Sequence, residues 1–360
     1  MIHFLYARSF YKTDAQNSPV IPYYLSQAEK YWLGKGLYQE GLLALVLHRH
    51  GKKEAAQKIV ASLRERAIVK DELGMYWPFD WGMYWYQLPI ETQALMVEVF
   101  DEVAADKKAV EELRIWLLKN KQTNRWNSTK ATAEAVYALL LHGENWLTST
   151  KPVQVTVGNK TLKMPEYEAG TGYFKQQWQG SEIKNNWDNI KVENPNAGPA
   201  WGAAYFQYFE DLDNIKTINN TPLKLKKELY RAENTDKGPV LKAITAADPL
   251  KPGDKITVRI EITTDRTMEY LHLKDMRGSG LEPVNVLSGY RWKGSLGYYE
   301  STKDLATHFF FDYLPKGTHV LEYTLVANLR GEFSNGISTL QCMYAPEFSA
   351  HSKGVRVKIQ

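Results

Sequence analysis

The chain has 360 residues, 44% of them hydrophobic and 24% charged, which is the composition of a folded globular protein. Its 45 basic and 41 acidic residues give a net charge of +4 and are interspersed, so no basic block indicates a nucleic-acid partner. A single cysteine, Cys342, excludes an internal disulfide framework and a cysteine-cluster metal site.

The chain as given carries no membrane or export segment. Its longest apolar run, Leu42–Leu47, is far too short to span a bilayer. The first ten residues, MIHFLYARSF, lack the basic start and long apolar core of a signal peptide. We expect no transmembrane segment here, although the chain could be the tail of a longer exported protein.

The first part of the chain predicts helices of two alternating kinds. Residues 37–50 are apolar almost all round and stop at Gly51, whereas the next stretch, KKEAAQKIVASLRERA, is amphipathic. The same pairing recurs in PIETQALMVEVFDEVA and DKKAVEELRIWLLKNK, and STKATAEAVYALLL begins a third pair. Aligning Thr92 with Thr132 gives an offset of about forty residues, the size of one helix-pair repeat. This alternation predicts an array or ring of helical hairpins.

After Trp146 the apolar pattern changes to the period of two that is typical of strands. PVQVTVGNKTLKMPE, with its Gly-Asn pair, predicts a hairpin, and further strands are expected at 173–178, 189–193 and 200–209. From 223 onward, strands alternate with Pro- or Gly-containing turns at the spacing of an antiparallel β-sandwich. The predicted fold class is therefore multidomain α and β, with helical hairpin repeats followed by antiparallel β domains.

No motif for catalysis or cofactor binding is present. The sequence lacks H-E-x-x-H, a Walker-type glycine loop and G-x-S-x-G. His48 and His50 are two residues apart on a predicted helix and point to different faces, which does not suit a shared metal ion. We predict no catalytic residue, no cofactor and no metal site.

An aromatic and acidic stretch, DELGMYWPFDWGMYWYQLPIET, supplies the candidate binding surface. Aromatic faces with carboxylates in a helical ring would suit a glycoside-cleaving enzyme, whose acid and base flank the bond. In the alternative interpretation, which we favour, the aromatic side chains fill the centre of the ring. The candidate surface residues are Trp77, Asp80, Trp81, Trp85, Glu91 and Trp126.

Four stretches resemble the C-terminal portion of bacterial α2-macroglobulin-like proteins, particularly those of Bacteroidetes type. They are GMYWPFDWGMYWYQLPIETQALMVEVF, WLLKNKQTNRWNSTKATAEAVYALLL, GLEPVN followed by YYESTKDLATHFFFDYLPKGTHVLEYTLVANLRGEFSNG, and QCMYAPEFSAHSKGVRVKI. The resemblance implies that residues 1–146 form the later part of a terpenoid cyclase-like α/α-toroid of thioester type. Residues 147–231 would be a CUB-like connecting β domain, whose first half precedes the toroid in this family. Residues 232–360 would be the terminal macroglobulin-like β-sandwich.

The resemblance also implies a function. Family members are broad-spectrum endopeptidase inhibitors that trap an attacking protease, and a Cys-Gln thioester within C-x-E-Q acylates it. This sequence has no C-x-E-Q motif, so the resemblance implies a non-enzymatic C-terminal region of a cell-envelope protease trap, periplasmic or at the cell surface. Target proteases, through the full-length protein, and an envelope protein are the implied partners. The alternatives are a carbohydrate-binding or carbohydrate-cleaving toroid protein with a β-sandwich accessory domain, and a protein-interaction module.

Overall fold

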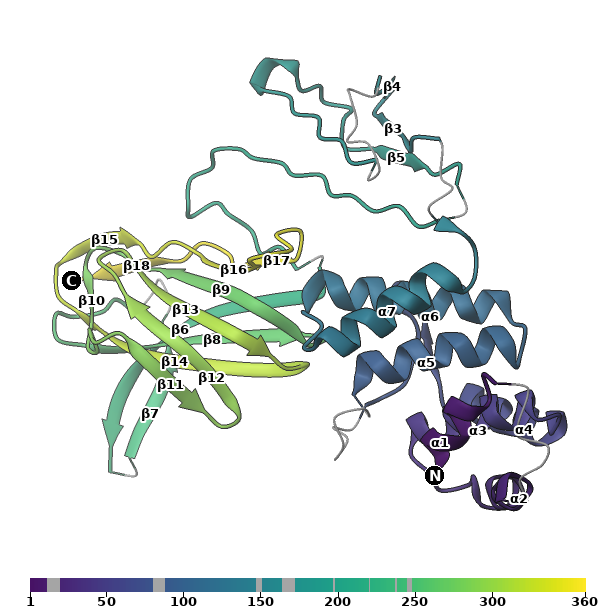
Figure 1. Ribbon diagram of the computed structural model, residues 1–360. Helices are drawn as coiled ribbons and strands as arrows, with labels where there is room; N and C mark the ends of the chain where they lie inside the picture. Colours follow the sequence, from purple (N-terminus) through teal and green to yellow (C-terminus); the bar gives the residue numbers. More distant parts are fainter. Residues whose placement is uncertain are drawn as a thin grey trace. The chain divides into compact units, whose positions relative to one another are not determined.

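The computed structural model of the chain describes residues 1–11, 20–79, 88–146, 151–163, 172–196, 198–219, 221–236, 238–244 and 248–360. It divides into two compact units (Figure 1). The first comprises Met1–Asn120 and Trp126–Gly202, and the second comprises Lys121–Arg125 and Ala203–Gln360. Each unit has its own hydrophobic core, the first helical and the second made of strands.

The described residues contain seven α-helices, which alternate in character as the sequence predicts. α3 is buried at every position from Glu40 to Leu47 and α5 at every position from Ile90 to Phe100, whereas α4 buries only one stripe. None of the described helices is long and apolar enough to cross a bilayer. The helices are α1 (Ile2–Arg8), α2 (Val20–Tyr31), α3 (Leu37–Arg49), α4 (Lys53–Glu65), α5 (Pro89–Glu102), α6 (Lys107–Thr123) and α7 (Thr129–Leu141).

Polar contacts fix the register of α1, α3 and α5. The Arg49 guanidinium of α3 donates to Glu98 Oε1 of α5 at 2.6 Å, and the Tyr6 hydroxyl of α1 donates to Glu98 Oε2 at 2.8 Å. Burial raises the pKa of the Tyr6 hydroxyl, and Glu98 raises it further. Because the Tyr6 hydroxyl stays protonated, it remains a hydrogen-bond donor to the carboxylate.

Two small sheets complete the first unit. A hairpin of β1 (Ile68–Lys70) and β2 (Gly74–Tyr76), which the sequence patterns did not predict, leads toward α5. A three-stranded sheet in the order β4-β3-β5 follows α7, and its β3–β4 hairpin turns at Gly158 and Asn159 as predicted. Its strands are β3 (Gln154–Val157), β4 (Lys160–Thr161) and β5 (Ile190–Glu193).

The strands expected at 173–178 and 200–209 are not formed. Both segments lie outside any strand, and residues 201–210 are exposed throughout. A strand needs a neighbouring strand for its backbone hydrogen bonds, and no described residues supply one there. The prediction of strands in these two segments was therefore wrong.

The second unit is a β-sandwich of two antiparallel sheets. One has the order β10-β14-β8-β6-β7 and the other β11-β12-β13-β9-β16-β17, and Figure 1 shows them lying face to face. The strands are β6 (Leu223–Thr235), β7 (Gly238–Ala243), β8 (Lys255–Thr264), β9 (Met268–Met276), β10 (Leu281–Pro283), β11 (Gly289–Lys293), β12 (Leu296–Thr302), β13 (Ala306–Leu314), β14 (Gly317–Ala327), β16 (Ser338–Cys342) and β17 (Ser349–His351), with β15 (Gly331–Ser334) and β18 (Arg356–Ile359) in a separate pair.

The sandwich core follows from strict alternation along the central strands. In β8 the buried positions alternate from Ile256 to Thr264, and in β13 Phe309 and Phe311 point inward. Side chains from both sheets join one core cluster, as expected for sheets that pack face to face. β6 pairs with β8 from Leu223 to Arg231, so the domain boundary expected at 231 falls inside a strand of this sandwich.

Candidate functional site

Trp77, one of the predicted surface residues, lies in the helical core. It follows β2, is 2% exposed, and its indole Nε1 donates to the Leu63 carbonyl at 2.9 Å. Its ring packs against Phe100 of α5 with centroids 6.1 Å apart. Trp77 therefore fills space beneath α5, and Asp80, Trp81 and Trp85 lie outside the described residues.

Glu91, the second described candidate, is also buried. It occupies the first turn of α5, is 1% exposed, and neither carboxylate oxygen has a hydrogen-bond partner in the described part of the chain. Burial raises the pKa of Glu134 on α7, and Glu91 and Glu98 raise it further, against the opposing effect of Lys130. The Lys130 Nζ lies 2.5 Å from Glu134 Oε1. Acidic groups thus gather between α5 and α7, one of them with an ammonium partner.

Gln93, which the sequence did not single out, joins α5 to two neighbouring elements. The side chain is fully buried, and its Nε2 donates to the Met75 carbonyl of β2 at 2.8 Å and to the Leu113 carbonyl of α6 at 3.2 Å. Gln93 lies one turn into α5, on a helix face that is otherwise apolar. That position could have indicated a buried amide, which needs hydrogen-bond partners.

Replacing Gln93 by leucine is expected to lower the free energy of unfolding of the helical unit by about 1–3 kcal/mol, because two buried carbonyls lose their donor. Thermal unfolding followed by helical circular dichroism measures the loss. Gln57→Leu is the control, since Gln57 donates to the Val103 carbonyl from an exposed position where water can replace it. Equal losses in the two variants would contradict the burial argument.

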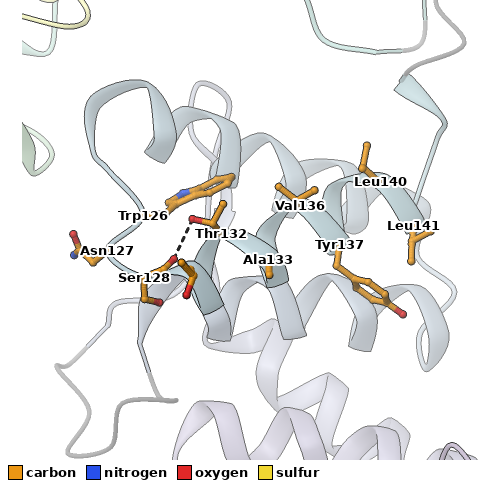
Figure 2. A pocket seen from close by; sticks show the side chains of 10 residues that line it. Trp126, Asn127, Ser128, Thr132, Ala133, Val136, Tyr137, Leu140 and Leu141 are labelled. Atoms are coloured by element: carbon orange, nitrogen blue, oxygen red, sulfur yellow. Dashed lines mark hydrogen bonds between the residues drawn. The ribbon is translucent and has the colours of Figure 1, made fainter.

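Trp126, the last candidate, lines an open apolar groove along α7 (Figure 2). Ser128 caps the helix, since its Oγ accepts from the Ala131 amide at 3.0 Å, and the Thr132 hydroxyl donates to the Ser128 carbonyl at 3.0 Å. The groove has a volume of about 930 Å³. It is lined by Trp126, Asn127, Ser128, Thr129, Thr132, Ala133, Val136, Tyr137, Leu140 and Leu141.

The groove is suited to packing rather than to catalysis. None of its lining residues is an acid, a histidine, a lysine or an arginine, so it offers no charged group to transfer a proton or hold a metal ion. Across the described residues, no three His, Cys, Asp or Glu side chains are placed to bind a metal ion together. Of the three predicted surface residues that the structure describes, Trp126 alone lies at a groove.

A buried charge pair in the second unit also escaped the sequence analysis. Lys227 of β6 and Asp275 of β9 have fully buried side chains, and Lys227 Nζ lies 2.7 Å from Asp275 Oδ1. Lys227 also donates to the Met276 carbonyl at 2.7 Å and to the Asn335 carbonyl at 3.3 Å. Because β6 and β9 belong to opposite sheets, this pair joins the two layers of the sandwich.

Two hydroxyl groups complete the polar network around Asp275. Ser338 Oγ of β16 donates to Asp275 Oδ1 at 2.6 Å, and the Tyr323 hydroxyl of β14 donates to Oδ2. Burial raises the pKa of Tyr323 well above its usual value, and the Asp275 charge adds to that rise. The Tyr323 hydroxyl therefore remains a donor, and every polar atom of the pair has a partner.

The second unit also matches a known protein family. Residues 223–347 match the bacterial alpha-2-macroglobulin MG10 domain. Residues 223–347 therefore belong to this bacterial alpha-2-macroglobulin domain family. The match begins at Leu223, where β6 begins, so the MG10 domain includes the strand that the sequence analysis had divided.

Solved structures of alpha-2-macroglobulin from Escherichia coli are similar to the whole chain. The trypsin-activated form has 13% sequence identity and a TM-score of 0.41, and covers all of this chain, which spans 23% of it. The form activated by porcine elastase has 14% identity and a TM-score of 0.39, and the chain spans 30% of it. A curated protein, Circularly permutated Ras protein 2 of Dictyostelium discoideum, is 25% identical over 107 residues, which are 30% of this chain and 3% of that protein. The chain is thus much shorter than the proteins it matches.

Within the MG10 domain, Cys342 is a structural residue. Its side chain is buried, and its Sγ contacts the Glu269 carbonyl at 3.5 Å. Burial raises the pKa of the thiol, which disfavours the reactive thiolate.

The MG10 domain also carries a stacked histidine pair, on the face of its six-stranded sheet that points away from the sandwich core. His272 Nε2 of β9 and His308 Nδ1 of β13 are 2.8 Å apart, and the rings are nearly parallel, with Phe310 stacked on His272. Burial lowers the pKa of both imidazoles from 6.5. Lys274 lowers both further, together with His308 in the case of His272 and Lys303 in the case of His308.

This pair is expected to make the MG10 domain less stable in mild acid. A histidine whose pKa is lower in the folded than in the unfolded state contributes full stability above pH 6.5, and that contribution is lost as the pH falls below it. The urea midpoint measured at a series of pH values from neutral downward should therefore fall. His272→Gln with His308→Gln should flatten that fall, and an unchanged pH profile in the double variant would contradict the assignment.

Proposed function

We propose that this chain is the non-catalytic C-terminal region of a broad-spectrum protease inhibitor of the bacterial alpha-2-macroglobulin type. The observation that carries the proposal is the match of residues 223–347 to the MG10 domain. The sequence has no C-x-E-Q motif, so the thioester of such an inhibitor would come from outside this chain or be absent. In this role the chain has no enzymatic activity of its own.

The helical unit is proposed to be the later part of the toroid that carries the thioester in active family members. Support comes from the alternation of all-buried helices, α3 and α5, with the amphipathic α4. The unit would position the reactive segment, and the MG10 domain would act as a docking or hinge surface during rearrangement. The three-stranded β4-β3-β5 sheet would belong to the connecting domain, whose remaining strands would come from a preceding segment.

The cellular setting and the partners follow from the same proposal. We place the protein in the bacterial cell envelope, in the periplasm or at the cell surface, and keep the Bacteroidetes type as part of the proposal. Its partners would be the target proteases, bound through the full-length protein, and an envelope protein. A carbohydrate site is not proposed, because Trp77 and Glu91, two of its would-be contact residues, are buried.

The proposal predicts that the 360-residue chain alone does not inhibit proteases, because it contributes neither a bait region nor a thioester. Trypsin and elastase should digest a protein substrate at unchanged rates in its presence. A stable 1:1 inhibitory complex of this chain with either protease would overturn the proposal that this chain is a non-inhibitory part of a larger inhibitor.

A further inference from the structure

The buried charge pair of the MG10 domain holds an amine and a carboxyl group in direct contact. Lys227 Nζ lies 2.7 Å from Asp275 Oδ1, and both side chains are fully buried. Two ionised side chains in a water-free core carry a large desolvation cost. Condensation of the two groups to an amide would remove both charges from the core and expel one water molecule.

The hydrogen bonds of Lys227 orient its nitrogen toward Asp275. The ammonium carries three protons, and one of them faces the Asp275 carboxylate. The others are donated to the Met276 carbonyl at 2.7 Å and to the Asn335 carbonyl at 3.3 Å. When the first proton moves to Asp275, the other two stay on the backbone carbonyls. The lone pair left on the nitrogen then points at the Asp275 carboxyl group, as nucleophilic attack requires.

Two hydroxyl donors hold the carboxyl group of Asp275. Ser338 Oγ donates to Oδ1 at 2.6 Å, and the Tyr323 hydroxyl donates to Oδ2. Burial and the Asp275 charge keep the pKa of Tyr323 well above its usual value, so this hydroxyl stays protonated. Fixed donors of this kind stabilise the negative charge that develops on oxygen when a nucleophile adds to a carboxyl group.

We propose that Lys227 and Asp275 condense to an intramolecular isopeptide bond, for which the ion pair is the reactant state. The bond joins the two sheets of the sandwich covalently, because Lys227 lies in β6 of the five-stranded sheet and Asp275 in β9 of the six-stranded sheet. A chain with a single cysteine cannot form an internal disulfide to do this. The inference goes beyond the proposed function, because it depends on the sandwich core and not on protease inhibition.

The reaction balances within the pair. One proton of the Lys227 ammonium passes to Asp275 Oδ1, and the neutral amine attacks Cγ to form the C–N bond, while negative charge develops on Oδ2 against the Tyr323 hydroxyl. A second proton then passes from the nitrogen to Oδ1, the Cγ–Oδ1 bond breaks, and water leaves. The nitrogen keeps one proton as an amide N–H, and nothing is oxidised or reduced. Because the core excludes water, hydrolysis of the new bond is suppressed.

Mass spectrometry of the folded and then denatured 360-residue chain tests the proposal. The wild-type chain is expected to weigh less than its sequence mass by one water, about 18 Da. After trypsin digestion, the peptide of residues 227–231 should be joined to the peptide of residues 275–277, because trypsin does not cleave after an acylated lysine. This branched peptide assigns the lost water to the pair, since dehydration elsewhere leaves the two peptides separate.

Three variants give the matched comparisons. Lys227→Arg keeps the positive charge but supplies a guanidinium that stays protonated and does not attack, so this variant should keep its full sequence mass. Lys226→Arg changes the exposed neighbouring lysine and should lose the water as the wild type does. Tyr323→Phe removes the donor to Oδ2, and after cell-free synthesis it should lose the water at least tenfold more slowly than the wild type.

Two results would overturn the proposal. One is a folded wild-type chain that keeps its full sequence mass, because the pair would then be a permanent ion pair. The other is a loss of water that persists in Lys227→Arg. An unchanged rate in Tyr323→Phe would overturn the role assigned to that hydroxyl. None of these results bears on protease inhibition, which the digestion experiment tests separately.

Discussion

Replacing Lys227 by methionine is expected to lower the free energy of unfolding of the MG10 domain by about 3–5 kcal/mol, because Asp275 is left buried without its counter-charge. The Lys227 ammonium donates to three acceptors, and the side chains of Lys227 and Asp275 are fully buried. Water therefore cannot reach Asp275 to replace the ammonium. Tyr323 and Ser338 would still donate to Asp275, but a hydroxyl does not neutralise a carboxylate. Removing one partner of such a pair therefore costs far more than the pair contributes overall.

Native-state hydrogen exchange of the β8 amides measures this loss for the MG10 domain alone. The matched control is the neighbouring residue, Lys226→Met. Its Nζ lies 3.0 Å from Glu228 Oε1 on the solvated side of the same strand, with a side chain that is 62% exposed. We expect little change for Lys226→Met, and a Lys227→Met variant that exchanges no faster than this control would contradict the buried-pair assignment.

Replacing Gly74 by alanine is expected to destabilise the helical unit by about 2–5 kcal/mol. Gly74 begins β2 with a φ of +74°, a left-handed conformation that costs an L-residue about 1–2 kcal/mol. A Cβ there would also lie 2.1 Å from the Glu112 carbonyl oxygen of α6, so the backbones must separate, and such overpacking costs about 1–3 kcal/mol more.

Gly34 isolates the conformational part of this loss. Its φ is +77°, but a Cβ there would meet no atom within 4 Å. Gly34→Ala should therefore cost only the left-handed strain, about 1–2 kcal/mol. Thermal unfolding of both variants, followed by helical circular dichroism, gives the comparison. Equal losses of stability in the two variants would mean that β2 and α6 separate at no measurable cost, which would contradict the prediction for Gly74→Ala.

Helix periodicity and turn residues were sufficient to predict much of the fold. The all-round apolar stretch at 37–50 became α3, and the Gly-Asn pair marked the β3–β4 turn. Both signals are local, so the sequence contains them completely. The segments 173–178 and 200–209 failed because a strand also needs a partner, and that requirement is not local.

The buried lysine shows what a stricter use of the same pattern would have found. The stretch LKLKKELYR alternates with the period of two that is typical of a strand, and β6 does form there. Its inward positions are Leu223, Leu225, Lys227 and Leu229, so the period of two places one lysine in the core. An inward lysine requires a partner, and Asp275 occupies the corresponding inward position after Leu271 and Leu273 in β9.

The candidate surface was less predictable, because residue type does not determine which way a side chain faces. Trp77 and Glu91 flank the region of highest aromatic content, yet β2 and α5 turn both of them into the core. Among the candidates in the described ranges, Trp126 alone lines a groove, and that groove is apolar. The sequence therefore predicted where these helices begin and end. It did not predict which of the aromatic and acidic side chains are buried in the core and which line a groove.

We propose that this chain is one part of a protease inhibitor and does not inhibit by itself. The most direct measurement compares trypsin digestion of a protein substrate in the presence of the complete product of the gene that encodes this chain, and in the presence of residues 1–360 alone. The complete product is expected to suppress digestion at near-equimolar amounts and to form a stable complex with trypsin, whereas residues 1–360 should do neither. Inhibition by residues 1–360 alone, or no inhibition by the complete product, would contradict the proposal.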